Sequence, residues 1–275
     1  MTLKAGTDAS GIIHPDYLEQ IVTALVESSI VKHSLYIDAS GSGDHTISVP
    51  YVNPASLVPY ITSESATVAP DQTPTYGKGV ITLTKFTAQV VATNEFMADA
   101  ISGFLPSLRT TLADVLIEAV EGLAVASVDA GISSVTAAGA NPTYAEYAEA
   151  MSSVSAFGHR KAAWYVNPAH YVSNMLPVAP AGSCCGGNLP PDAIGSFGGY
   201  PVIPVPLMSA SGTGKVVAWF GDLSKSLAIA TDSKSGDIRL LEEPKAVTDE
   251  TIIQAKIRAG AAFLGNGTLY GVKLP

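Results

Sequence analysis

The stretch that most constrains this chain is a long amphipathic segment between Ser102 and Asp129. Ser102 is a suitable N-cap, and Pro106 lies in the first turn, where few intrahelical hydrogen bonds are lost. Gly131 supplies a stop just beyond the periodic residues. About 28 residues at a rise of about 1.5 Å each predict a rod of about 40 Å. Such a rod either supports several layers of a fold or is an ordinary core helix, and periodicity leaves both open.

The two sides of this predicted helix differ in polarity. Apolar residues recur at steps of three and four along one face: Leu105, Leu108, Leu112, Val115, Leu116, Ala119, Leu123 and Ala126. The other side carries charged residues: Arg109, Asp114, Glu118 and Glu121. We therefore expect the first face to pack against the body of the protein and the second to meet solvent.

The composition indicates a protein that buries surface between subunits. The 275 residues suffice for one large domain or two modest ones. Only 14% of them are charged, whereas 47% are hydrophobic, and interface cores are depleted in charge. The formal net charge of −9 argues against binding nucleic acid by neutralising its phosphates, though not against enclosing DNA.

The cysteines and the N-terminal residues indicate the kind of cellular compartment in which the protein resides. Cys184 and Cys185 are adjacent and are the only cysteines, so a disulfide framework is absent and a reducing compartment is expected. The first residues lack the apolar core of a signal peptide, and no apolar run reaches about 18 residues. We expect neither secretion nor a membrane span.

Motifs that carry chemistry are weak in this sequence. Ser211–Lys215 is similar to a phosphate-binding loop, but Ser209 stands where a glycine is required and Val216 where Ser or Thr should bind magnesium. The five histidines show no helical pair that could hold zinc, and His159 is expected to be a solvated turn residue. We expect no catalytic residue, no cofactor and no metal.

A long hairpin is predicted before the helix. Its strands are expected over Tyr60–Val68 and Tyr76–Thr93, joined by a turn at Pro70–Pro74. The second strand would place Val80, Thr82, Thr84, Phe86, Ala88 and Val90 on one side. The separate run Thr46–Val49 alternates as a half-buried strand does. A long hairpin with a polar tip cannot bury itself within one domain, so we expect it to project onto a neighbouring subunit.

The rest of the chain is expected to form a mixed α and β domain. Short helices are expected from about Asp16, over Glu95–Ile101, Tyr144–Phe157 and His170–Leu176. Pro177–Gly199 is expected to be a loop, and Tyr200–Pro206 an edge strand because of its prolines. Further strands are expected at Ala163–Val166, Val216–Asp222, Ser226–Thr231, Ile238–Glu242, Glu250–Phe263 and Gly267–Leu274.

The order of these features resembles the major capsid protein of tailed double-stranded DNA bacteriophages, which has the Hong Kong 97 fold. The hairpin from Glu64 through Pro70 to Glu95 resembles the E-loop of that family, and Ser102–Asp129 looks like its spine helix. Three stretches are similar to parts of the axial domain: Trp164–Pro168, Gly199–Val202 and Trp219–Ser224. Together these motifs span roughly four-fifths of the chain, in the family's order.

The resemblance implies an α+β fold and a division of the chain. Residues 1–34 would form an N-terminal arm, 35–93 the E-loop with flanking strands, and 94–135 a peripheral domain with the spine helix. Residues 136–235 would form the axial domain, and 236–275 strands shared by both domains. Hexamers and pentamers would close an icosahedral shell around double-stranded DNA, in a virion assembled in the host cytoplasm.

The implied partners are further copies of the chain, a scaffolding protein, a portal and a decoration protein, with no membrane. Many relatives carry an N-terminal scaffolding segment that a protease removes. Here either that segment is missing from the sequence, or a separate protein does the scaffolding. Some relatives crosslink a hairpin lysine to an asparagine of a neighbour, but no matching acid and asparagine can be picked out here.

The resemblance also directs attention to residues that would contact neighbouring subunits. They are Tyr17, Glu64, Lys78, Lys85 and Arg109. Two alternatives remain: an encapsulin-like shell that holds cargo enzyme, and an unrelated cytosolic enzyme with a β-rich domain.

Overall fold

The structure is a computed structural model. It describes residues 25, 29–40, 45–52, 76–93, 95, 104–179, 189–241, 250–265 and 267–275. Side chains are described for all of these except 104–106, 109 and 233–241. The predicted strand Tyr60–Val68, the helix from Asp16, nearly all of the helix Glu95–Ile101, and both cysteines lie outside the described residues.

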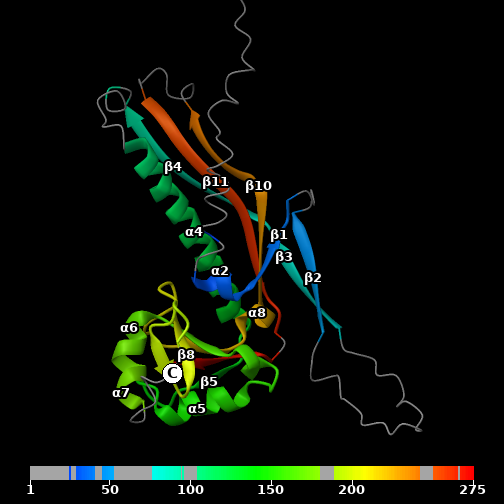
Figure 1. The fold of residues 1–275 in the computed structure, drawn as a ribbon, viewed down its shortest axis with the longest axis vertical. Helices are drawn as coiled ribbons and strands as arrows, with labels where there is room; N and C mark the ends of the chain where they lie inside the picture. Colours follow the sequence, from blue (N-terminus) through cyan, green and yellow to red (C-terminus); the bar gives the residue numbers. More distant parts are fainter. Residues whose placement is uncertain are drawn as a thin grey trace, which may run out of the picture.

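One half of the molecule is a long helix packed on a four-stranded sheet (Figure 1). The helix α4 runs from Phe104 to Gly131. The sheet order is β1 (Leu35–Asp38), β10 (Leu227–Leu241), β11 (Glu250–Phe263) and β4 (Thr84–Thr93). Alternate residues of β11 are buried beneath α4 in the main core, among them Ile253, Ala255 and Ile257. The predicted helix was correct to within two residues at each end.

The buried face of α4 differs from the prediction in part. The fully buried line runs through Leu112, Leu116, Val120, Ala124 and Val128. Steps of four residues advance about 40° around the helix each time, so this line winds over the sheet beneath it. Val115 is instead 48% exposed, and Ala126 is exposed. The sequence offers two adjacent apolar stripes, and periodicity could not say which one the sheet covers.

The other half is built on a six-stranded sheet with a second core. Its order is β5 (Ser134–Thr136), β12 (Leu269–Lys273), β9 (Val216–Gly221), β6 (Ala163–Val166), β8 (Tyr200–Pro204) and β7 (Gly195–Phe197). The helix α5 (Tyr144–Ser153) begins with a capping box at Thr143 and packs Tyr147 against Trp164 and Phe197. Short helical segments follow β6: α6 (Pro168–His170), a π-helical stretch (Tyr171–Met175) and α7 (Leu176–Val178).

Two predictions in this half were wrong. β8 is not an edge strand, because β7 pairs with it and Phe197 is fully buried. The small residues of β7 had made this segment look like part of a loop. His159 is not a solvated turn residue either: it lies in a 3-10 helix (Gly158–Lys161), and its Nδ1 atom is 3.1 Å from the hydroxyl of Tyr200.

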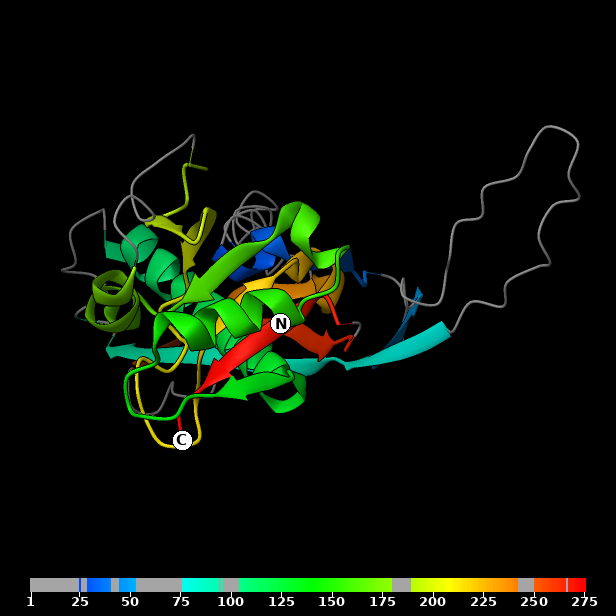
Figure 2. The ribbon, with the colours of Figure 1, turned by 90° about the horizontal axis from the view of Figure 1, so that it is seen from below.

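A two-stranded ribbon projects from the first half (Figures 1 and 2). It consists of β2 (Thr46–Val52) and β3 (Tyr76–Thr82), paired antiparallel from Thr46–Thr82 to Val52–Tyr76. The predicted strand Tyr76–Thr93 is therefore two strands, interrupted at Leu83, whose N–H donates to the carbonyl of His45. β3 pairs with β2, whereas β4 pairs with β11.

The break at Leu83 reverses the alternation of buried residues. Ile81 of β3 and Leu83 at the break are buried, but Phe86, Ala88, Val90 and Ala92 face the core on β4. The prediction that Val80 and Phe86 share a face was therefore wrong. Beside this break Gly260 of β11 lies so close to Ile81 and Thr82 that a Cβ there would meet their atoms, so its lack of a side chain permits the close approach of β3.

Candidate subunit interface and the junction behind it

The ribbon β2–β3 packs on one face of the four-stranded sheet where β10 begins and β11 ends, and α4 packs on the opposite face. Ile81 and Val49 of the ribbon pack in a small core with Ala228, Ala230 and Ala262. Their neighbours Leu227, Ile229 and Ala259 belong to the core beneath α4. Since successive residues of a strand point to opposite faces, the ribbon and α4 lie back to back across the sheet.

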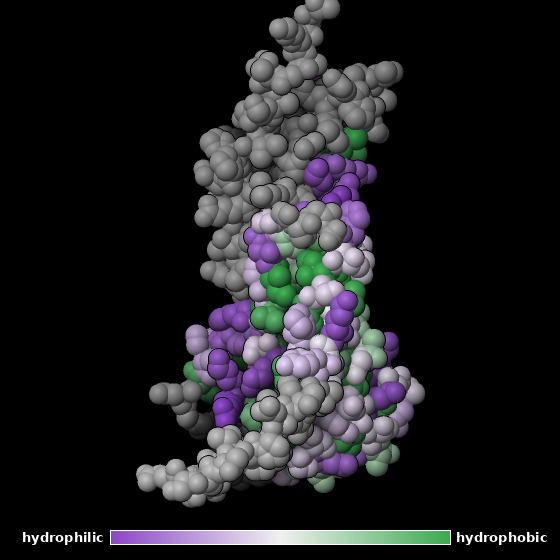
Figure 3. Space-filling view, turned by 90° about the vertical axis from the view of Figure 1, so that its right-hand side faces the viewer, coloured by the Kyte–Doolittle hydropathy of each residue, from purple (hydrophilic) through white to green (hydrophobic). Residues whose placement is uncertain are grey.

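The outward face of the ribbon is exposed and largely uncharged. It consists of four cross-strand pairs: Thr46–Thr82, Ser48–Val80, Pro50–Lys78 and Val52–Tyr76. Tyr76 is 69% exposed, Val80 54% and Val52 40%. Figure 3, which looks at the side of the molecule bearing the ribbon, shows hydrophobic patches among neutral and hydrophilic surface. The three exposed apolar side chains on one face of the ribbon make this face a candidate site of association.

The inward face fixes the orientation of the ribbon. Tyr51 lies across the strand from Gly77, and its ring occupies the place where a side chain of Gly77 would be. Gly79 leaves room in the same way for Leu264. The glycines of β3 therefore let the ribbon sit close to the body, so its outward face has a defined direction.

Two of the predicted contact residues are described with their side chains, and they lie on different sheets. Lys78 is exposed in the centre of the outward ribbon face. Lys85 is exposed on β4, opposite Arg258 of β11. Arg109 belongs to α4 but its side chain is not described, and Tyr17 and Glu64 lie outside the described residues. The role of all five in contacts between subunits stays a prediction.

The sequence reasoning missed the apolar members of the outward face. Tyr76 and Val80 alternate with Gly77, Gly79 and Ile81, and this alternation was the available signal. It shows which residues share a face, but the burial of Ile81 against the body decides which face is free.

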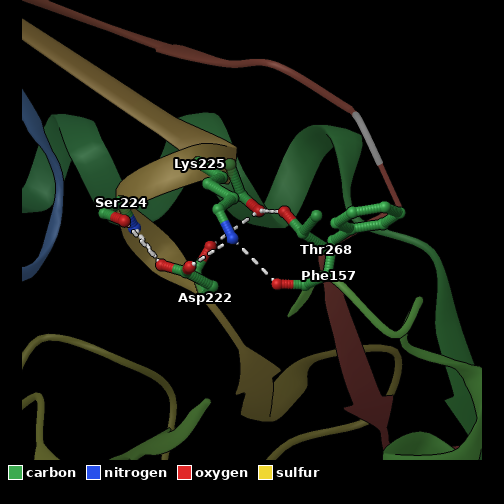
Figure 4. Close-up of polar contacts among 6 residues, drawn as sticks. Phe157, Asp222, Ser224, Lys225 and Thr268 are labelled. Carbon is green, nitrogen blue, oxygen red and sulfur yellow. Dashed lines mark hydrogen bonds and ion pairs between the residues drawn. The ribbon is translucent and has the colours of Figure 1, made fainter. Parts of the chain in front are cut away.

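A polar junction ties the two halves together where the chain crosses between the sheets (Figure 4). Asp222, at the end of β9, caps the short helix α8 (Leu223–Ser226) by accepting hydrogen bonds from the backbone N–H and hydroxyl of Ser224. Lys225 Nζ lies 3.0 Å from Asp222 Oδ2 and donates to the carbonyl of Phe157 at 2.8 Å. The Ser226 and Thr268 hydroxyls are 2.6 Å apart.

The end of α4 is joined to the second sheet by another polar contact. Trp219 Nε1 donates to Asp129 Oδ1 at 3.0 Å, in the last turn of the helix. Burial raises the pKa of Asp129, although the Trp219 hydrogen bond and nearby Lys215 act in the opposite direction. The folded protein therefore holds a proton on Asp129 more tightly than the unfolded chain does, and the ionised form costs stability at neutral pH.

We expect Asp129→Asn to stabilise the protein at pH 7. The amide oxygen can still accept from Trp219, while the negative charge at the helix C-terminus, which costs about 0.3–1 kcal/mol, is removed. The gain should shrink as the pH falls through the pKa of Asp129, because the wild-type carboxyl then becomes neutral as well. Chemical denaturation at several pH values measures this, and a variant less stable than wild type at pH 7 would contradict it.

The helix α2 (Ser29–His33) is held to the second half by a polar clasp in which His33 and Lys32 meet Asp192. His33 Nε2 is 2.6 Å and Lys32 Nζ 3.2 Å from Asp192 Oδ2. Burial acts to raise the pKa of Asp192, but hydrogen bonds from His33, its own backbone and Lys32 hold that pKa below its usual range. The carboxylate thus contributes stability above its unfolded-state pKa, and this is lost as the pH falls through the folded-state value.

Accordingly, Asp192→Asn should lower the free energy of unfolding at pH 7 by up to about 1 kcal/mol, as expected for a partly exposed ion pair. The difference from wild type should disappear as acid protonates the wild-type carboxylate. Denaturation curves from pH 7 down to about pH 2 test this, because the pKa of Asp192 lies below the usual value for an aspartate. A difference that stays constant to the lowest pH would be inconsistent with the clasp.

Within the described residues, no three His, Cys, Asp or Glu side chains are grouped to hold a metal ion. None of the described helices is both long and apolar enough to cross a membrane.

No protein-family model and no curated protein matches the sequence. Solved structures do match it. The model aligns with a chain of the capsid of the native GTA particle over 90% of this chain and 89% of that one, with a TM-score of 0.67 at 16% identity. This chain has a capsid-protein fold. A chain of Gordonia phage Cozz matches with a TM-score of 0.60 at 15% identity, over 90% of this chain and 86% of that one. One of Mycobacterium phage Bobi matches with a TM-score of 0.58 at 15% identity, over 90% of each.

The alignments cover 90% of this chain. The resemblance found in the sequence is confirmed at the level of the fold.

Proposed function

We propose that this chain is the structural subunit of a phage-type capsid, which assembles with copies of itself into a closed icosahedral shell around double-stranded DNA. The observation that carries the proposal is the likeness to a capsid chain over 90% of the sequence. The outward ribbon face, with its exposed Tyr76 and Val80, supports it because such a surface is best covered by another subunit. The role is structural, without catalysis.

The finer parts of the family are assigned as part of this proposal. The ribbon β2–β3 is the base of the E-loop, α4 is the spine helix, and the six-stranded sheet belongs to the axial domain. The predicted bounds 1–34, 35–93, 94–135, 136–235 and 236–275 stay predictions; β10 already begins at Leu227, beside β1 and β11. Hexamers and pentamers, a separate scaffolding protein, a portal, a decoration protein and assembly in the host cytoplasm belong to the same proposal.

Electron microscopy and sedimentation of the purified protein test this function. We expect closed particles of uniform size that sediment far ahead of the subunit. Protein that stays monomeric under all assembly conditions would overturn the proposal. Particles isolated from the native source should contain double-stranded DNA; cargo enzyme in its place would instead favour the encapsulin-like shell.

A further inference from the structure

The second core contains a fully buried histidine that the proposed shell function does not use. His170 ends α6 directly before the π-helical stretch Tyr171–Met175, and none of its surface is exposed. The side-chain amide of Asn174, in that stretch, is 3.0 Å from Nδ1 of His170. A π-helical turn is rare and is often found at functional sites. An irregular backbone and a buried titratable ring therefore coincide here.

Both nitrogens of the His170 ring have partners that require the neutral form. Nδ1 lies 2.8 Å from the carbonyl oxygen of Ala210, which can only accept, so Nδ1 carries the ring proton. Nε2 lies 2.9 Å from the hydroxyl of Tyr147 on α5 and accepts a hydrogen bond from it. Burial raises the pKa of Tyr147, so this hydroxyl keeps its proton and remains a donor.

The surroundings of His170 offer no negative charge that would stabilise its protonated form. The titratable groups beside the ring are the uncharged tyrosines Tyr147 of α5 and Tyr171 of the π-helical stretch. The segment 205–210, which supplies the carbonyl, has no charged side chain. Glu146 of α5 acts electrostatically on Tyr147, but its carboxylate accepts from two backbone N–H groups before α5. Among the residues that the structure describes, no carboxylate bonds to His170.

A second proton on this ring would remove the hydrogen bond to α5 and place a charge in an aromatic core. Nε2 would become a donor and could no longer accept from Tyr147, against whose ring Trp164 and Phe197 pack. A buried charge without a partner is costly. Burial accordingly lowers the pKa of His170, although the hydrogen bond to Ala210 acts in the opposite direction.

We propose that His170 is an acid-operated latch between α5 and the helical segment 168–178. Protonation of Nε2 breaks the hydrogen bond to Tyr147 and releases this segment from α5, while α4 and the four-stranded sheet keep their structure. Val172 and Leu176 of the segment are 63% and 41% exposed, so only one side of it is anchored in the core. The latch does not depend on the proposed shell function.

The expected pH dependence follows from the linkage between protonation and opening. When the segment is open, His170 titrates near its ordinary value of 6.5, whereas the closed form binds the proton less readily. The closed form is therefore most stable above about pH 6.5. It loses stability as the pH falls from there toward the lowered pKa of the closed form. Within this window the opening equilibrium constant should rise by up to about tenfold for each pH unit.

Hydrogen exchange of the full chain between pH 7.5 and pH 5, followed by mass spectrometry and corrected for the intrinsic exchange rate, tests the latch. Peptides covering 144–153 and 168–178 should lose protection as the pH falls, whereas peptides of α4 and β11 should keep theirs. His170→Gln cannot be protonated and should make this protection independent of pH. His159→Gln is the matched control, because His159 also contacts a tyrosine hydroxyl in this half. It should retain the pH dependence.

A proton NMR titration of the histidines gives a second readout that needs no variant. The C2–H resonance of His170 should have a midpoint below pH 6.5. A midpoint at or above that value, or wild-type protection of 168–178 that does not change with pH, would overturn the latch. So would a His170→Gln variant that keeps the pH dependence. Loss of the pH dependence in His159→Gln would assign the effect to His159 instead, and the proposal would fail.

Discussion

Replacing Gly221 by alanine is expected to lower the free energy of unfolding by more than about 2 kcal/mol, the largest loss among alanine substitutions of the glycines that the structure describes. Gly221 ends β9 with a φ of 137°, a conformation that residues with a Cβ rarely adopt. It is also buried where β9 meets β12, and a Cβ there would press on the carbonyl oxygen of Thr268 and lie 3.0 Å from Cα of Leu269. Both neighbours are backbone atoms, so neither can move away cheaply.

The position of Gly221 matters because the next residue in the sequence is Asp222, which belongs to the polar junction shown in Figure 4. The N–H of Asp222 donates to the same Thr268 carbonyl, so moving that carbonyl would strain the crossing between the two halves. We expect the subunit to lose stability as a whole. Guanidinium denaturation of the unassembled subunit measures the effect.

Gly199→Ala is the matched control for backbone strain alone. Gly199 has a φ of 85°, but nothing lies within 4 Å of the position of its Cβ. Alanine there should cost only about 1 kcal/mol. Equal losses for the two variants would show that the close approach to Thr268 contributes nothing.

Much of the fold could be predicted where a segment carries its own pattern. The bounds of β6 and β11 agree with the strands expected at Ala163–Val166 and Glu250–Phe263, and α4 agrees to within two residues. In each case the pattern that predicts the element lies within the element itself, and turn or cap residues next to it mark its ends.

The predictions failed where the structure of a segment depends on residues that are distant in the sequence. The strand Thr46–Val52 was recognised in part, but not as the partner of β3, because nothing local fixes that register. The reversal of faces at Leu83 occurs where the chain lies against Gly260, which is remote in the sequence. The same limit applies to the candidate interface: Lys78 could be selected from a resemblance, whereas the free face around it required knowing what Ile81 packs against.

The second large effect concerns assembly. We expect the double variant Tyr76→Asp with Val80→Asp to fold as wild type but to form no particles. Both side chains are largely exposed in the subunit, and each loses one cross-strand pair worth up to about 1 kcal/mol, so the free energy of unfolding should fall by no more than about 2 kcal/mol. In a contact each would bury apolar surface worth about 1.5–3 kcal/mol, and the variant would bury a carboxylate in its place. A shell repeats that loss at every subunit, so a modest penalty per contact removes the assembled state altogether.

The control for this prediction keeps the shape and apolar character of the face. Tyr76→Phe with Val80→Ile should form particles at wild-type yield, since neither change introduces a charge. Sedimentation of all three proteins at equal concentration, with circular dichroism of the subunits, makes the comparison. Particles from the double aspartate variant would mean that the outward ribbon face stays in contact with solvent in the shell. The apolar exposure of Tyr76 and Val80 would then need a different occupant, because the ribbon's own inward face is already filled by Val49, Ile81 and Leu264.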